Sequence, residues 1–412
     1  MQTKYPDVVV VGAGIAGASI AAVLARGGLE VVLLERQRSY RDRVRGEYMA
    51  PWGVLEARAA GLEAVMRGTH AVDARYTVPY DELFAPAAAE TAKRDNSTIL
   101  PDVRGPLCAS HPKACQALAD EAVRAGAELV RGVTEVRVQA GTRPSMAYRN
   151  GSEVQVQPRL IIGADGRAST VRKQSGIRIE KAPATHVIAG LLVEGASRWP
   201  DDQYAIGVEG DLQFYVFPQG TGRVRLYTCH ANEQAARWAG RAGPQRLLRA
   251  FARLQSIPAA LGLGDVKAAG PCATFGGEQT WCEEPYADGV VLLGDAGGYD
   301  DPVDGQGLSL AMRDVRQLSE FLLASGDWTV TGLRPYGHQR AERLRRMRRV
   351  SRTYAALMTT FTADGRARRS RYYAASRARQ DDIRMALGAI WLGPDRLPSE
   401  AFTDQLHESL LA

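Results

Sequence analysis

The chain begins with an uninterrupted apolar run, Val8–Val11, that leads directly into Gly12, Gly14 and Gly17. An alanine-rich stretch follows, and then a second apolar run that ends on Glu35, eighteen residues after Gly17. Apolar runs without polar alternation are typical of strands that are buried on both faces of a parallel sheet. The pattern therefore predicts a strand–helix–strand unit over residues 8–35.

The glycines in this unit have the spacing of a dinucleotide-binding turn. Gly12 permits the tight turn, Gly14 lets the backbone approach a pyrophosphate at the helix N-terminus, and Gly17 lets the helix lie close to the sheet. Glu35 can accept hydrogen bonds from a ribose. Because strand, glycines, helix, strand and acid occur in register, they indicate a dinucleotide site more strongly than the glycines alone.

Two later apolar strands also end close to an acid. Leu160–Gly163 precedes Asp165, and Val290–Leu293 precedes Asp295. Open α/β sheets bind ligands beyond the carboxyl ends of their strands. The Gly305–Gln306–Gly307 turn then opens a predicted helix, 308–323, whose free backbone N–H groups suit a developing negative charge.

Between these segments the pattern changes to consecutive strands, predicted at 186–194, 204–208, 212–217 and 224–229 and interrupted by a helical stretch over 231–254. Further predictions are helices at 54–61 and 112–125, a strand over 128–138, and helices from 308 to the end. The predicted fold class is α/β, a Rossmann-like nucleotide-binding domain with an inserted antiparallel β-sheet domain and a helical C-terminus. We expect the nucleotide-binding domain at 1–75, 106–182 and 281–330, the substrate domain at 76–105 and 183–280, and C-terminal helices at 331–412.

Composition restricts the class of protein. The 412 residues are 45% hydrophobic and 24% charged, which is typical of a globular chain with a full core. Residues 8–25 are uncharged, but Asp7 and the glycine spacing argue against a membrane span or a signal peptide. Five cysteines without a CxxC pair favour the reducing cytoplasm, and the scattered histidines indicate no metal site.

The net charge of +6 is concentrated late in the chain, where Arg340–Arg349 is crowded with arginine. Such a run can be a nucleic-acid or lipid surface, or a solvated helix face. Few aromatics interleave and no recognition motif surrounds it, so we favour the solvated face. We expect a small-molecule substrate, no nucleic-acid partner and no stable membrane association; the oligomeric state stays open.

The three strand–acid segments together resemble the FAD-dependent aromatic hydroxylase family, the p-hydroxybenzoate hydroxylase-like single-component flavoprotein monooxygenases. The likeness covers residues 7 to about 325. It implies non-covalent FAD, NAD(P)H as a transient reductant, and O2. The implied activity is hydroxylation or oxidation of a small aromatic or natural-product-like substrate through a flavin C4a-hydroperoxide. Because no second GxGxxG occurs, NAD(P)H has no Rossmann domain of its own.

The resemblance also implies roles for individual residues. Asp165 would serve both FAD and NAD(P)H, with Arg172 closing its motif, and Asp295 would hold the ribityl chain. Arg225 is the one catalytic candidate, because the family places an arginine near the flavin there. The full set of implied FAD contacts is Gly12, Gly14, Ala16, Gly17, Glu35, Arg36, Arg45, His111, Val136, Asp165, Asp295, Pro302, Gly305, Gln306, Gly307 and Leu308.

Other residues have two interpretations each. Phe214, Tyr215, Phe217 and Tyr227 line either a substrate pocket or the core, since strand alternation places only half of them on one face. His230 is an acid–base group or, more in keeping with a lone histidine, structural. The acids after residue 299 bind a metal or, as we favour, are solvated or cap the helix dipole; they are Asp300, Asp301 and Asp304.

The sequence departs from the family in ways that bear on the reaction. Gly297–Gly298 stands where many members have Ala–His, Leu308–Ser309 replaces Met–Asn, and His111 replaces a frequent arginine. The Asp301–Pro302 loop is also similar to geranylgeranyl reductases and flavin halogenases. The alternative function is therefore a flavin-dependent reductase of isolated double bonds; no Trp-x-Trp pair supports a halogenase.

Overall fold

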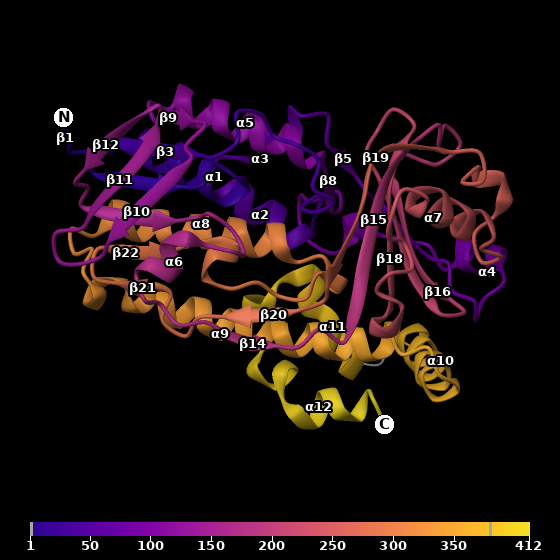
Figure 1. Cartoon of the computed structure of the whole chain (residues 1–412). Helices are drawn as coiled ribbons and strands as arrows, with labels where there is room; N and C mark the ends of the chain where they lie inside the picture. The colour runs from indigo at the N-terminus through magenta and orange to yellow at the C-terminus, as the bar shows by residue number, and fades with distance from the viewer. Residues whose placement is uncertain (1–2, 379–380) are drawn as a thin grey trace.

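The computed structural model describes residues 3–378 and 381–412 (Figure 1). Figure 1 shows one half that contains the N-terminal strands and helices, a second half built on a long twisted sheet, and C-terminal helices that run along the lower edge of both. The predicted α/β fold class is confirmed.

A six-stranded sheet forms the centre of the first half. Its strands run parallel except for the pair at one edge, β21 with β22. In spatial order they are β21 (Tyr286–Ala287), β22 (Val290–Leu292), β13 (Leu160–Gly163), β2 (Val8–Val11), β3 (Val31–Glu35) and β9 (Glu128–Arg131).

Layers on both faces of this sheet explain the unbroken valine run of β2. Val8 and Val10 pack into a core shared with the helices α1 (Ile15–Arg26), α5 (His111–Arg124) and α8 (Gly307–Ala324). Val9 and Val11 pack on the other side, against a small sheet made of β10 (Glu135–Gln139), β11 (Ser145–Asn150), β12 (Ser152–Val156) and β1 (Thr3–Lys4). Because both faces are covered, no position of the strand tolerates a polar residue.

A seven-stranded sheet forms the second half. All its pairs are antiparallel except β6 with β16, which run parallel. Its strands in spatial order are β19 (Lys267–Gly276), β15 (His186–Glu194), β18 (Arg223–Ala231), β17 (Leu212–Pro218), β16 (Gln203–Glu209), β6 (Tyr76–Pro79) and β7 (Arg94–Asp95). Residues 76–105 thus contribute two strands to this sheet, and the short helix α4 (Pro86–Thr91) lies between them.

Smaller elements join the two halves. A two-stranded ladder pairs β14 (Glu180–Ala182) with β20 (Gln279–Trp281), and a three-stranded one pairs β8 (Leu107–Cys108) with β4 (Tyr48–Met49) and β5 (Val72–Asp73). The remaining helices are α2 (Pro51–Ala59), α3 (Glu63–Arg67), α6 (Thr170–Gln174), α7 (Gly243–Ala252), α9 (Val330–Met358), α10 (Ala363–Arg377), α11 (Asp381–Leu392) and α12 (Asp404–Ser409).

Three predicted elements need correction. The single strand expected over 128–138 is two strands in different sheets, β9 and β10, because Gly132 turns the chain with a φ of 78°. The helical stretch expected over 231–254 contains only a short 3-10 turn and α7; Gly240, with a φ of 76°, lies before the helix. The strand β19 was missed by the predictions, because its Ala/Gly-rich sequence has Thr274 as its one β-branched residue.

The predicted C-terminal helices are confirmed as α9 to α12. None of the helices in the described ranges is long and apolar enough to cross a membrane.

Candidate FAD and substrate site

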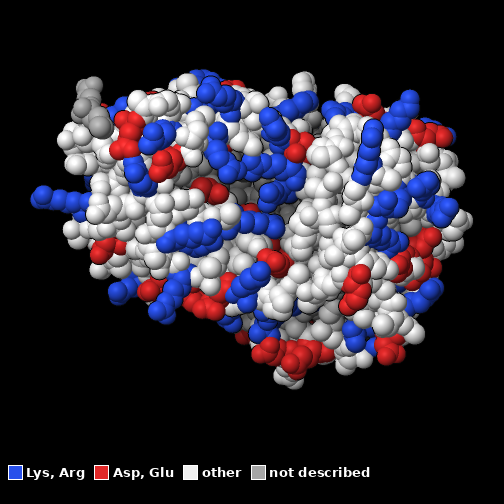
Figure 2. Space-filling view, viewed as in Figure 1, with Lys and Arg blue, Asp and Glu red and all other residues white. Residues whose placement is uncertain are grey.

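One cavity of about 750 Å³ connects the strand ends of the six-stranded sheet with the inner face of the seven-stranded sheet. Figure 2 shows the hollow between the two halves, with lysine and arginine side chains around it. Most of the predicted FAD contacts line this cavity; they are Gly12, Gly14, Ala16, Glu35, Arg36, Arg45, His111, Val136, Asp165, Asp295, Pro302, Gly305, Gly307 and Leu308.

The three fingerprint glycines divide into two kinds. A Cβ atom at Gly12, whose φ is 99°, would lie 2.5 Å from the carbonyl oxygen of Ala164, and one at Gly17 would collide with the Gly12 carbonyl. These two glycines are therefore required by the fold. A Cβ at Gly14 would meet nothing within 4 Å, so this residue borders open space at the N-terminus of α1. That space fits a pyrophosphate held by backbone N–H groups.

Glu35 ends β3 with its carboxylate already held by the backbone. One oxygen accepts from the Ala13 N–H at 2.9 Å and the other from the Gln37 N–H at 2.7 Å. These bonds fix the carboxylate beside the fingerprint turn at the cavity wall. Each oxygen has a second lone pair, so the group can also accept from a ribose hydroxyl.

The Asp165 segment is a braced turn after β13. The Asp165 carboxylate accepts from the Ser169 hydroxyl at 2.5 Å and from the Thr170 N–H at 2.6 Å, at the start of α6. Arg172 donates to the carbonyl oxygens of Ala296 at 2.8 Å and Arg167 at 3.1 Å. Arg172 therefore ties this turn to the Asp295 segment.

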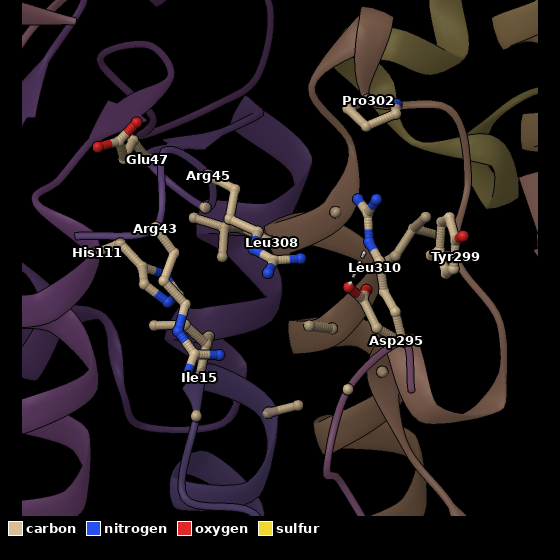
Figure 3. Close-up of a pocket in the computed structure, with 18 of the residues that line it drawn as sticks. Ile15, Arg43, Arg45, Glu47, His111, Asp295, Tyr299, Pro302, Leu308 and Leu310 are labelled. Atoms are coloured by element: carbon tan, nitrogen blue, oxygen red, sulfur yellow. Dashed lines mark hydrogen bonds and ion pairs between the residues drawn. The ribbon is translucent and has the colours of Figure 1, made fainter. Parts of the chain in front are cut away.

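Asp295 faces the cavity from the end of β22. Its Oδ2 lies 3.4 Å from Arg167 Nε, the contact drawn as a dashed line in Figure 3. The segment is held from behind by Arg340 of α9, which donates to the carbonyls of Gly294 and Gly297 at 2.8 and 2.7 Å. The carboxylate is thus fixed where a ribityl hydroxyl could donate to it.

In the loop 302–307, one glycine is sterically crowded and the other borders open space. Gly305 has a φ of 74°, and a Cβ there would lie 2.8 Å from the Tyr48 ring. A Cβ at Gly307 would meet nothing within 4 Å. Gln306, in contrast, is fully buried away from the cavity, where it accepts from Trp52 Nε1 at 2.8 Å and donates to the Ile390 carbonyl. The Gln306 side chain therefore stabilises the loop and is not among the cavity-lining residues of the described chain, so its predicted contact with FAD stays a prediction.

His111 and two arginines stand opposite this loop, as Figure 3 shows. Burial lowers the pKa of His111 to about 4, so its imidazole is neutral at neutral pH. Burial also lowers the pKa of Arg45. In the described part of the chain neither Arg43 nor Arg45 forms an ion pair, so both remain able to bind anionic groups.

The aromatic residues of β17 and β18 lie on two faces of the sheet, because successive side chains of a strand point to opposite faces. Tyr215, Phe217 and Tyr227 line the cavity, and the rings of Tyr215 and Phe217 stack at 5.5 Å. Phe214 points to the other face, is 0% exposed, and packs edge-to-face on Phe251 of α7. The structure therefore does not bring Phe214 to the cavity.

Arg225 lies behind the cavity wall in a buried ionic cluster. It is 1% exposed, and its Nη2 lies 2.7 Å from Asp42 Oδ2 and 2.5 Å from Glu47 Oε1. The Tyr227 hydroxyl donates to Glu47 Oε2 at 2.5 Å. Burial, only partly offset by Arg225, raises the pKa of Glu47 to about 7. Arg225 therefore holds residues of the cavity wall in place through these contacts. It is not itself one of the residues that line the cavity.

The loop acids do not have the solvated setting that we favoured. Asp300, Asp301 and Asp304 are 7%, 4% and 6% exposed, because α9 packs over the loop. Asp301 does act as a cap, accepting from the Val303 N–H at 3.0 Å. Within the described residues no His, Cys, Asp and Glu cluster has the arrangement of a metal site.

His230 is buried beside Trp238, and it does not line the cavity.

The C-terminal helices complete the cavity. Tyr354 of α9, with Ile390 and Trp391 of α11, lines it from the side opposite the strands. Sequence reasoning missed these residues, because an apolar side chain on an amphipathic helix carries no sign of which cavity it reaches.

Comparison with known proteins agrees with this geometry. The FAD binding domain family model matches residues 5–351. The chain belongs to the FAD binding domain family. The predicted resemblance to FAD-dependent aromatic hydroxylases is confirmed, and the protein is an FAD-binding oxidoreductase.

Relatives in this family include both oxygenases and reductases. The chain is 29% identical to digeranylgeranylglycerophospholipid reductase of Methanothrix thermoacetophila over 80% of its own length and 81% of the relative's. It is 29% identical to rifampicin monooxygenase of Rhodococcus hoagii over 79% and 66% of the two lengths. The structure of p-nitrophenol 4-monooxygenase PnpA from Pseudomonas putida superposes with a TM-score of 0.75 at 19% identity, covering 100% of this chain and 97% of that one.

Proposed function

We propose that this protein is an FAD-dependent, NAD(P)H-consuming monooxygenase that hydroxylates or oxidises a small aromatic or natural-product-like substrate. The observation that carries the proposal is the single cavity that joins the dinucleotide fingerprint to a chamber walled by Tyr215, Phe217 and Tyr227. FAD, when bound, supplies hydride acceptance and oxygen activation. The protein supplies placement of the cofactor and the substrate.

The fingerprint end supports FAD at defined residues. The open space at Gly14 would take the pyrophosphate, and Glu35 and Asp295 would accept from the sugar hydroxyls. The open space at Gly307, where α8 presents its N-terminus, would take the edge of the ring system. Backbone N–H groups there stabilise negative charge without rearranging, because they are fixed by the fold.

The cavity mouth supports a transiently docked NAD(P)H. It carries several cationic side chains, and they are Arg36, Arg41, Arg43, Arg45 and Arg167. Guanidinium groups bind phosphates in bidentate geometry. The abundance of arginine favours NADPH, whose additional phosphate offers one more anionic group than NADH. The five cysteines are free, which is consistent with the proposal that the enzyme uses this coenzyme in the reducing cytoplasm.

The chamber supports an apolar, ring-containing substrate. Aromatic side chains from β17 and β18 line it together with Ile390 and Trp391 of α11. Planar substrates can stack on such rings, which adds to the free energy of burial. The walls come from both halves and from the late helix α11, so a bound substrate would be contacted from several elements at once.

A reductase of isolated double bonds is the second candidate, because a reductase is among the relatives with high coverage. Anaerobic and aerobic assays separate the two. A monooxygenase oxidises NAD(P)H with oxygen uptake that rises with substrate, across a panel of phenols and polyketide-like aromatics. Saturation of a prenyl double bond without oxygen consumption would assign the reductase function instead.

A further inference from the structure

Two buried carboxyl groups beside the cofactor loop share one hydroxyl. Ser351 of α9 places its Oγ 2.7 Å from Asp300 Oδ2 and 2.8 Å from Asp304 Oδ2. All three side chains are more than nine-tenths buried. Both aspartates also line the cavity, on either side of Pro302.

Counting hydrogens shows that this arrangement holds a proton. A serine hydroxyl carries one hydrogen, so it can donate to only one of the two carboxyl groups. The other short contact is favourable only if that carboxyl is itself protonated and donates to Ser351 Oγ. Two carboxylates this close in a buried site cannot both ionise. The two groups together therefore carry one negative charge and one shared proton.

The neighbours leave that charge without a direct counterion. Gln279 of β20 donates to Asp300 Oδ1 at 2.7 Å, and Asp304 Oδ1 is buried with no hydrogen-bond partner. No arginine or lysine in residues 3–378 and 381–412 forms an ion pair with either aspartate. The titratable and charged groups that face the pair are Asp301, His186 of β15 at 3.3 Å from Asp301, Tyr215 of β17, and Arg348, Arg352 and Tyr354 of α9.

Both carboxyl groups accordingly bind protons more readily than free aspartate does. Burial raises the pKa of Asp300 to about 6 and raises that of Asp304 well above its usual range. Arg348 acts on Asp300 from its position over the Trp281 ring, at 4.0 Å, without reaching the carboxylate. Asp304, which has no donor at its Oδ1 in the described chain, therefore holds the shared proton at rest, and a second proton can be taken up by Asp300, which accepts hydrogen bonds from Gln279 and from the Asp301 N–H.

We propose that Asp300, Ser351 and Asp304 form a shared-proton pair that takes up one further proton when FAD bound at this loop is reduced. The proposal rests on the proposed function in placing the cofactor against residues 302–308. Hydride transfer from NAD(P)H leaves one net negative charge on the cofactor. One proton from solvent takes the pair from one negative charge to none, so the total charge of the closed site is unchanged.

The same proton has a use in the proposed reaction. Oxidation of NAD(P)H by O2 with insertion of one oxygen atom into substrate consumes one proton that the hydride does not bring. The pair can return its extra proton as the cofactor is reoxidised. Asp300 would then be the group that takes up and returns the extra proton, and Asp304 the group that holds the proton remaining in the pair.

Infrared difference spectroscopy of the FAD-loaded protein tests this directly. Chemical reduction without substrate should produce a new C=O band of a protonated carboxyl that shifts in protein grown on isotopically labelled aspartate. The band should be lost in Asp300→Asn and retained in Asp301→Asn, which changes the same loop but does not touch Ser351. Full occupancy by FAD, measured from the flavin absorbance, establishes that each variant is folded.

Absence of an aspartate band in wild type, or its persistence in Asp300→Asn, would overturn the proposal. The wild-type measurement needs no variant, so misfolding cannot hide the answer. It also needs neither oxygen nor substrate. A protein that shows the band but never consumes oxygen would contradict the proposed monooxygenase activity while leaving the shared-proton pair intact.

Discussion

At the scale of single residues, Glu35 connects the fold to cofactor affinity. Glu35→Ala removes the proposed acceptor for the ribose and also frees the Ala13 and Gln37 N–H groups. We expect FAD binding to weaken by about 1–3 kcal/mol, the range for a hydrogen bond to a charged group. Titration of the apoprotein with FAD measures this. The exposed Glu30, at the other end of β3, provides the control, and an equal loss in Glu30→Ala would contradict a specific role.

The buried His230, which lies away from the cavity, should make the stability of the fold depend on pH. Burial lowers its pKa from 6.5 to about 4, so between these values the unfolded chain binds a proton that the folded chain does not. Folding stability from this residue is thus complete above pH 6.5 and is lost as the pH falls toward 4. In His230→Leu this part of the acid dependence should disappear. Urea unfolding of both proteins across the window checks it, and parallel curves would show that His230 is protonated in the native state.

At the scale of elements, two glycines in the loop before α8 have different expected roles: Gly305 stabilises the fold, and Gly307 leaves room for the ligand. Gly305→Ala places a side chain at a φ of 74° and against Tyr48, which should cost about 1–3 kcal/mol of unfolding free energy. Gly307→Val projects into open space and should leave the apoprotein as stable as wild type. The same variant should slow reduction of FAD while ADP still competes for the fingerprint end. Unfolding curves and stopped-flow reduction measure the two effects; equal destabilisation by both would contradict this division.

The helix α9 corrects our expectation of a solvated basic face. Arg340 is buried against Asp314 at 2.8 Å and also binds the backbone after β22. Arg340→Met leaves Asp314 without this partner and should cost about 3–5 kcal/mol. Arg345, which pairs with Glu342 on the exposed side of α9, should cost only about 0.2–1 kcal/mol when changed to Ala. Chemical unfolding compares them, and similar losses would mean that Arg340 is not a structural clamp.

At the scale of the whole molecule, most arginines of the run 340–349 are paired with acids within the fold. Arg343 pairs with Asp314, Arg346 with Glu342, and Arg349 with Asp404. We therefore expect no nucleic-acid binding tighter than the micromolar, salt-sensitive level of any cationic surface. Fluorescence anisotropy with duplex DNA and single-stranded RNA over a salt series checks this. Sequence-dependent binding at physiological salt would contradict it.

The amino-acid sequence by itself determined the cofactor half of this protein. Residues 8–35 specify strand, turn, helix and strand through their local spacing, in which Gly17 packs on the Gly12 carbonyl; the close approach of Gly12 to Ala164 comes from the pairing of β2 with β13. The same holds for Asp165 and Asp295, which follow apolar strands whose parallel pairing places their ends together. The domain boundaries and the individual FAD contacts stay predictions.

Tertiary structure alone decided the rest. Strand alternation could not tell which face of β17 meets the cavity, so Phe214 and Phe217 became distinct only when α7 covered one face. Arg340, Ser351 and Trp391 act on residues far away in the chain, and no local pattern carries such contacts. The loop acids looked solvated because charged residues usually are, yet the packing of α9 buried them and joined two of them through one hydroxyl. Burial and pairing are properties of the packed chain. The sequence therefore drew attention to these acids but could not predict their roles.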